Sequence, residues 1–99
     1  MSFWKNPFGD RESSLAEQAE QLLMGHFSTY WERHPSTPEQ RQEVLRLIHE
    51  RISMTASDVL RRILDATLPP FITAGILDKI ADRVYGGNST FFLKLLTQR

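Results

Sequence analysis

Apolar residues recur at steps of three and four along most of the chain, which is the spacing of helices that bury one face. In the first such stretch, Ser14 and Glu17 have the spacing of a capping box, and Pro35 marks the point where a helix must end. We therefore predict a first helix from about Ser14 to His34. Its predicted inward residues are Leu15, Ala19, Leu22, Leu23, Phe27, Tyr30 and Trp31.

The stretch of residues 36–68 is the one around which we expect the rest of the chain to pack. Thr37 and Gln40 form a capping box around Pro38, so a helix begins there. The apolar steps then continue without interruption, which leaves open whether the stretch forms one helix or two. We favour a break at residues 53–58, because several hydroxyl side chains there compete with helical hydrogen bonds. The predicted inward residues are Val44, Leu45, Ile48, Ile52, Val59, Leu60, Ile63 and Leu64.

A further helix is predicted to begin at Pro70, directly after the proline pair that ends the preceding one. It ends at residues 86–87, two glycines that can adopt the left-handed conformation of a helix cap. Asp78 and Asp82 are one turn apart and run beside basic residues, so we interpret them as part of a solvated face. The predicted inward residues are Ile72, Ile76, Leu77, Ile80, Ala81 and Val84.

The last predicted helix, from Thr90 to about Thr97, is apolar nearly all round. Such a helix is either buried on several sides or docked on another molecule. Phe92, Leu95 and Leu96 form its natural inward set, which leaves Phe91 partly outside and Leu93 farther round, beside Lys94. Because exposed apolar patches mark association sites, we predict a homodimer or a partner complex built on this helix.

Taken together, these elements predict an all-α protein, an irregular bundle of four to five helices in a single small domain. No stretch has the alternating pattern of a strand, and the length is that of one domain. The predicted helical domain covers residues 13–99. We expect one shared core made of Leu45, Ile48, Ile52, Val59, Ile63, Ile76, Ile80 and Val84.

Residues 1–12 form an aromatic N-terminal arm rather than a helix, because proline and glycine break the segment. Phe3, Trp4 and Phe8 are too apolar to remain in water, since each ring can bury about 150–250 Å². The pattern leaves open whether the arm closes the core or binds a partner. We take the three aromatic residues as candidate partner-binding residues.

Charge and cysteine content narrow the function classes. Lys plus Arg number 12 and Asp plus Glu number 12, so the chain lacks the basic excess typical of proteins that bind nucleic acid or membrane surfaces. With no cysteine, disulfides and thiolate metal sites are excluded. We see neither a signal peptide nor an apolar run of the roughly 18 residues that a membrane span needs, and we expect a cytoplasmic protein.

The chain carries no recognisable catalytic or metal-binding motif. His26 and His34 are about 12 Å apart along one helix, which is too far for both to bind one ion. His49 and Glu50 begin a zinc-protease motif, but Ser53 replaces its second histidine. We therefore predict no catalytic residue, no metal and no cofactor.

Residues 41–66 resemble the two-helix part of ribbon-helix-helix DNA-binding proteins. The segment Ser57-Asp58-Val59-Leu60-Arg61 is similar to the start of the second helix in that family. The resemblance implies a nucleic-acid-binding regulator that uses Arg61 and Arg62, and a helix-turn-helix reading implies the same. The chain departs from the family because a helix cap replaces the DNA-reading strand and the turn lacks its usual glycine.

Our leading hypothesis is a small, non-catalytic protein–protein interaction protein, either a regulator, an adaptor or an accessory subunit. The sequence carries no recognisable catalytic or metal-binding motif, and apolar segments occur at both of its ends. We expect a protein partner and a homodimer, with nucleic-acid binding as the alternative. The candidate partner-binding residues are Phe3, Trp4, Phe8, Phe91 and Leu93.

Overall fold

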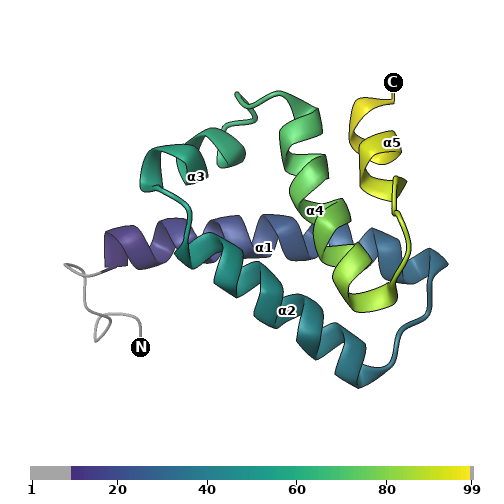
Figure 1. The fold of residues 1–99 in the computed structure, drawn as a ribbon. Helices are drawn as coiled ribbons and strands as arrows, with labels where there is room; N and C mark the ends of the chain where they lie inside the picture. Colours follow the sequence, from purple (N-terminus) through teal and green to yellow (C-terminus); the bar gives the residue numbers. More distant parts are fainter. Residues whose placement is uncertain (1–9, 99) are drawn as a thin grey trace.

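The computed structural model describes the backbone of residues 10–98 and the side chains of residues 15–98. Within this range the chain is all-α and contains no strand, as predicted. Phe3, Trp4 and Phe8 of the predicted arm lie outside the described residues. The helices are α1 (Asp10–Arg33), α2 (Pro38–Ser53), α3 (Ser57–Leu64), α4 (Pro70–Tyr85) and α5 (Phe91–Thr97), and Figure 1 shows their arrangement.

The predicted break in the central stretch is confirmed, because α2 ends at Ser53 and α3 begins at Ser57. The hydroxyl of Ser53 donates to the carbonyl of Glu50 at 2.8 Å, and that of Thr55 donates to the carbonyl of Arg51 at 2.6 Å. These bonds take up carbonyls at the end of α2, as expected for hydroxyl residues that compete with a helix. The capping box at the start of α2 is also present.

α1 begins at Asp10, four positions before the predicted start at Ser14. Residues 10–12, which we assigned to the arm, are therefore helical. The apolar pattern misses this turn because it contains no apolar residue.

α3 ends in a left-handed cap that contains alanine instead of the usual glycine. Ala66 has a φ angle of 58°, and it is the one non-glycine residue with positive φ among the described residues. The amide of Thr67 donates to the carbonyl of Arg62 at 2.9 Å, and that of Ala66 donates to Ile63 at 3.2 Å. These two bonds form a Schellman motif, in which a side chain at the left-handed position is strained.

Replacing Ala66 with Gly is expected to raise the free energy of unfolding by up to about 1 kcal/mol. Glycine adopts the left-handed conformation without the contact between Cβ and the backbone, although its freer unfolded chain offsets part of the gain. Chemical denaturation followed by circular dichroism measures the difference. The matched control is Ala56→Gly at the N-cap of α3, where φ is −65° and no strain exists to relieve. Because glycine is also favoured over alanine at an N-cap, a gain in stability from Ala66→Gly no larger than that from the control would contradict the assignment of strain.

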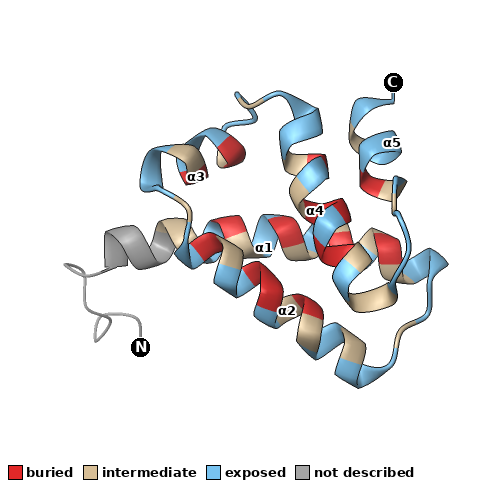
Figure 2. Ribbon diagram, viewed as in Figure 1, coloured by how far each residue is buried: buried red, intermediate tan, exposed pale blue. Residues whose placement is uncertain are grey.

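The helices pack around α1. α2 and α3 both pack on α1, whereas α4 packs on α2 and on α5 (Figure 1). Figure 2 shows that the buried residues lie where these helices face one another. The buried apolar residues are Ala19, Leu23, Phe27, Tyr30, Val44, Leu47, Ile48, Ile52, Leu60, Ile63, Ala74, Leu77, Ile80, Ala81 and Phe92.

Most of the predicted inward residues belong to this core or pack against it, with five corrections. On α2, Leu47 is 5% exposed and belongs to the core, whereas Leu45, like Leu64 on α3, is half-buried and lies outside it. The other three corrections are residues predicted inward that are exposed: Leu22 on α1, Ile72 on α4 and Leu95 on α5. Two causes account for these differences. Apolar residues spaced three apart and four apart lie on slightly different faces of a helix, and a face without a neighbouring helix stays exposed.

Asp78 is the main departure from the predicted pattern, because it is buried at 8% exposure rather than part of a solvated face. Its Oδ1 accepts from the amide of Phe92 at 2.9 Å and its Oδ2 accepts from the amide of Leu93 at 3.0 Å. The hydroxyl of Ser89 also donates to Oδ1, at 2.9 Å. Asp78 of α4 thus caps the N-terminus of α5, whose first amides have no partner within the helix. Asp82, half-buried one turn later, accepts from the amide of Ser89.

Aromatic rings join α1 to α5 on the other side of this cap. The ring of Phe92 is fully buried, with its centroid 4.8 Å from that of Phe27 and 5.6 Å from that of Tyr30. Burial raises the pKa of the Tyr30 phenol above its usual value, and the nearby Tyr85 and carboxylates raise it further. The cap and the rings together fix α5, a helix of only 7 residues that could not form alone.

Candidate functional site

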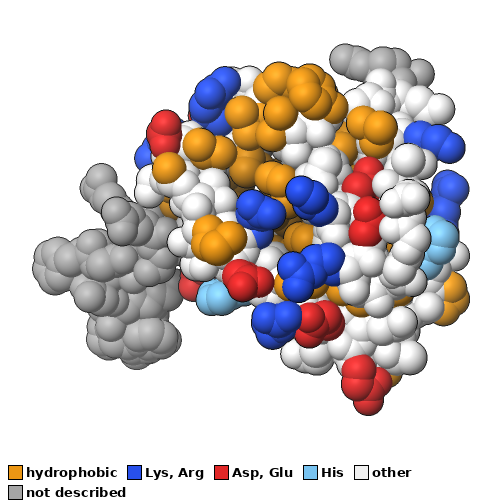
Figure 3. Space-filling model, viewed as in Figure 1, with side chains coloured by type: hydrophobic (Ala, Val, Ile, Leu, Met, Phe, Trp, Pro, Cys, Tyr) orange, Lys and Arg blue, Asp and Glu red, His pale blue; other side chains and the backbone are white. Residues whose placement is uncertain are grey.

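Among the described residues, the large apolar side chains that remain exposed are Leu22 on α1 and two further groups, one at the end of α2 and the start of α4 and one on α5. Met54, Phe71 and Ile72 are 67%, 57% and 40% exposed, and they belong to the end of α2 and to the first turn of α4. Leu93 and Leu95 are 40% and 39% exposed on α5. Figure 3 shows the side that carries the first of these two groups, where hydrophobic side chains cover the space between α3 and α4, with Lys and Arg side chains below them.

One face of α4 carries isoleucines at four-residue steps, and their exposure decreases along the helix. Ile72 is 40% exposed, Ile76 is half-buried and Ile80 is 5% exposed. Residues four apart lie one above another on a helix, so the three side chains form a continuous apolar stripe. α3 packs on α1 and not extensively on α4, and this leaves the upper part of the stripe without a covering helix.

The lower end of the stripe leads into a hollow of about 410 Å³ between α2 and α4. Its apolar lining consists of Ile80 and Leu47, both only 5% exposed, together with the exposed Met54. The charged residues that line it are Glu50, Arg51, Lys79, Asp82 and Arg83. We call the hollow and the stripe together the α4 groove (Leu47, Met54, Ile72, Ile76 and Ile80, with Arg51, Lys79 and Arg83).

Positive charge dominates the edges of the α4 groove. Arg51, Lys79 and Arg83 make no ion pair with any residue that the structure describes. Of the two carboxylates in the hollow, Asp82 is already engaged by the amide of Ser89. Three cations and two carboxylates therefore line the hollow, which leaves it a net positive charge of one unit, and a ligand with carboxylates could pair with the cations at an apolar surface.

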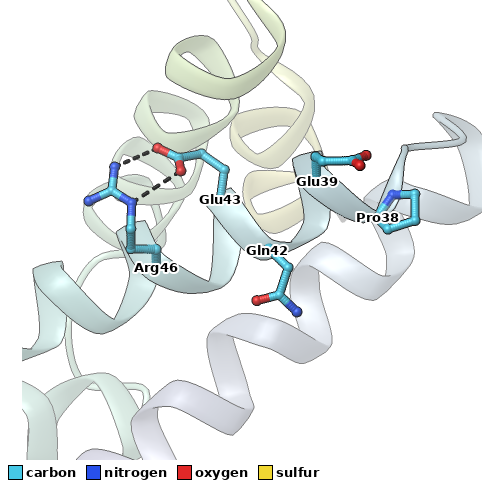
Figure 4. A pocket seen from close by; sticks show the side chains of 5 residues that line it. All are labelled: Pro38, Glu39, Gln42, Glu43 and Arg46. Carbon is cyan, nitrogen blue, oxygen red and sulfur yellow. Dashed lines mark hydrogen bonds and ion pairs between the residues drawn. The ribbon is translucent and has the colours of Figure 1, made fainter.

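A second hollow, of about 540 Å³, lies at the start of α2 and is shown in Figure 4. Its lining residues all come from this one helix, so no second element encloses it. Arg46 and Glu43 point toward each other, with 2.5 Å between Nη2 and Oε2. The hydrogen bond from Arg46 lowers the pKa of the Glu43 carboxyl below its usual value. This surface carries a solvated ion pair, and Pro38 is the one apolar residue among those that line it.

The predicted partner-binding residues of α5 separate in the structure. Phe91 is half-buried, as expected for a residue that lies partly outside, and its ring packs against Tyr30 with 5.1 Å between centroids. Its packing follows from α1, which passes beside α5 and offers aromatic rings. Leu93 is exposed, as expected, and Leu95 is exposed with it. Phe91 and Leu95 line a hollow of about 240 Å³ against α1 that also holds Arg33.

Arg61 and Arg62, the residues of the nucleic-acid alternative, are both exposed on α3. Asp58 is exposed in the first turn of the same short helix, and Asp65 is exposed at its end. The two carboxylates balance the two positive charges. The position that the strand occupies in ribbon-helix-helix proteins holds Thr37, the N-cap of α2. The role of the two arginines therefore stays a prediction.

Two of the three histidines, His49 and His34, have structural contacts. Nδ1 of His49 lies 3.6 Å from Oε1 of Glu20, a contact between α2 and α1, and the ring of His34 stacks on Tyr30. Within the described part of the chain, no group of three or more metal-ligating side chains comes together. No described helix is both long and apolar enough to cross a membrane.

The chain matches no family model, and neither the curated proteins nor the solved structures include a significant match to it.

Sequence reasoning missed the α4 groove because it placed Ile72 inward with the rest of its stripe. A usable signal was present in the chain. The stripe of α4 begins directly after a proline pair, where the chain turns away from α3, and Met54 lies at the end of α2. The start of α4 and the end of α2 are both ends of helices. At such ends an apolar stripe can extend beyond the neighbouring helices that cover its middle part.

Proposed function

We propose that the chain is a small, non-catalytic protein–protein interaction protein that acts in the cytoplasm as a regulator, adaptor or accessory subunit. The observation that supports this is the α4 groove, which combines exposed apolar side chains with an enclosed apolar floor. Covering side chains such as Met54 and Ile72 with another protein costs little free energy, because they are apolar. Their burial stabilises the complex by about 25 cal/mol per Å² of apolar area.

The test compares two aspartate variants at exposed apolar positions. Ile72→Asp places a negative charge in the α4 groove, and it should fold well because position 72 lies in the first turn of a helix that has no acidic residue there. Leu22→Asp alters an equally large side chain, 36% exposed on α1, and serves as the control. Crosslinking in the native host, quantified by mass spectrometry, should show protein partners that Ile72→Asp loses by about tenfold or more and Leu22→Asp retains. Equal partner recovery from wild type and Ile72→Asp would contradict the proposal.

We also propose self-association through α5, because Leu93 and Leu95 both remain exposed on this short helix. Sedimentation of the wild type should show a dimer, and a Leu93→Asp, Leu95→Asp variant should sediment as a monomer. Phe91 is left unchanged because its ring packs on α1. A wild type that remains monomeric at high concentration would contradict this proposal.

Nucleic-acid binding remains the alternative function. It predicts submicromolar binding to random duplex DNA at low salt, with a strong salt dependence that Arg61→Ala and Arg62→Ala reduce. An electrophoretic shift assay on the same preparations measures this. We rank it second, because Asp58 and Asp65 balance the charge of the two arginines.

A further inference from the structure

We propose that the α4 groove binds an amphipathic helix of a partner protein that carries acidic side chains beside its apolar face. This inference rests on the proposed function and specifies the chemistry of the partner. It follows from the spacing of the apolar residues in the groove and from the cations that border them.

The spacing of the apolar residues favours a helix as the ligand. Ile72, Ile76 and Ile80 form a row along α4 that is about 12 Å long, since each residue of a helix rises by 1.5 Å. A ligand helix presents its own apolar residues at steps of three and four, and such rows interdigitate when two helices pack at about 8–10 Å. Met54, at the end of α2, supplies an exposed and flexible side chain on the opposite edge, of a kind that adapts to different ligands.

The border of the groove favours acidic side chains on that ligand. Lys79 and Arg83 are exposed one turn apart on α4, and Arg51 lies across the hollow on α2. Two carboxylates one turn apart on the partner helix would reach both cations of α4, and the guanidinium groups can bind carboxylates through two parallel hydrogen bonds. A basic ligand helix would meet three like charges there.

The combination of an apolar floor with bordering cations also favours an amphipathic helix over a nucleic acid as the ligand. The cations border an apolar floor of Leu47 and Ile80, and Met54 and Ile72 extend the apolar surface beyond it. A phosphate backbone would leave these side chains in contact with charge, whereas an amphipathic helix covers them. Within the hollow the carboxylates of Glu50 and Asp82 interrupt the cations, whereas a polyanion needs a surface of uninterrupted positive charge.

The experiment is a selection from a displayed peptide library with the full chain as bait. Each peptide is a helix with fixed leucines at steps of three and four, and its flanking positions vary among Glu, Lys, Gln and Ser. The inference predicts that selected peptides are enriched in Glu at flanking positions one turn apart. Enrichment of Lys or of uncharged flanks, or no enrichment over a bait that lacks the groove charges, would overturn it.

Binding of the selected peptides is then measured by fluorescence anisotropy with matched variants. Lys79→Glu combined with Arg83→Glu should weaken binding by about tenfold or more and should favour peptides with Lys flanks. The control, Arg61→Glu combined with Arg62→Glu, makes the same charge change on the exposed face of α3 and should stay within about twofold. Thermal unfolding shows whether each variant is folded, and an uncharged Lys79→Gln, Arg83→Gln variant provides a second measure if the reversal unfolds.

The two proposals fail in distinguishable ways. If partners in the native host depend on Ile72 but the library selects basic or uncharged helices, the groove binds protein and the inferred charge of the partner is wrong. If partners in the native host do not depend on Ile72, the proposed function is wrong. Equal loss of peptide binding in the α4 and α3 reversal variants would show a general charge effect and would also overturn the inference.

Discussion

Replacing Asp78 with Ala is expected to lower the free energy of unfolding by about 3–5 kcal/mol. The carboxylate accepts hydrogen bonds from two backbone amides and one hydroxyl, and bonds to a charged group contribute about 1.5–3 kcal/mol each. Without it, the buried amide of Phe92 has no acceptor from α4, and the first turn of α5 is left uncapped. Asp78→Asn should lose less, because its one amide oxygen can still accept a hydrogen bond while its NH₂ group faces a donor.

Urea unfolding followed by circular dichroism measures this loss. Asp65→Ala is the matched control, because Asp65 is exposed at the end of α3, and this change should stay within about 0.5 kcal/mol. Hydrogen exchange gives a local readout, since the amides of Phe92 and Leu93 should exchange much faster in Asp78→Ala. If Asp78→Ala is no less stable than Asp65→Ala, the capping role is wrong.

Replacing Phe92 with Ala should also cost about 3–5 kcal/mol, as is usual for a fully buried phenylalanine. The ring contacts those of Phe27, Tyr30 and Phe91, with centroids 4.8, 5.6 and 5.0 Å away, so truncation leaves a cavity between α1 and α5. The same unfolding measurement applies.

The control for this prediction is Phe71→Ala, which removes the same atoms from a side chain that is 57% exposed. It should cost less than about 1 kcal/mol, because little buried contact is lost. Similar losses in Phe71→Ala and Phe92→Ala would mean that α5 is not part of the core. In that case the exposure of the two leucines of α5 would no longer support self-association through this helix.

The helices could be predicted from the sequence because their ends carry local signals. The capping box around Pro38, the hydroxyl residues before Ser57 and the glycines after Tyr85 each act within one turn. The role of Asp78 could not be predicted in this way, because its partners lie 14 and 15 positions along the chain. A carboxylate on a helix has the same local pattern whether it faces water or a neighbouring helix end.

The candidate site was less predictable than the fold. The apolar stripe of α4 was recognised in the sequence, but its exposed end at Ile72 depends on α3 packing against α1 instead of α4. The same limit explains α5, where Phe91 packs on Tyr30 and Leu95 is exposed. Which face of a helix remains uncovered is decided by its neighbours in space, and periodicity along the chain contains no information about them.

The contact between Phe27 and Phe92 also affects the order of events during synthesis. A ribosome releases α1 long before α5, so the rings of α1 have no α5 partner until residue 92 has left the exit tunnel. Until then Asp78 also lacks the amides that it binds in the finished fold. The nascent chain therefore presents an apolar site that chaperones can bind, and the folded state is reached only once α5 has been released.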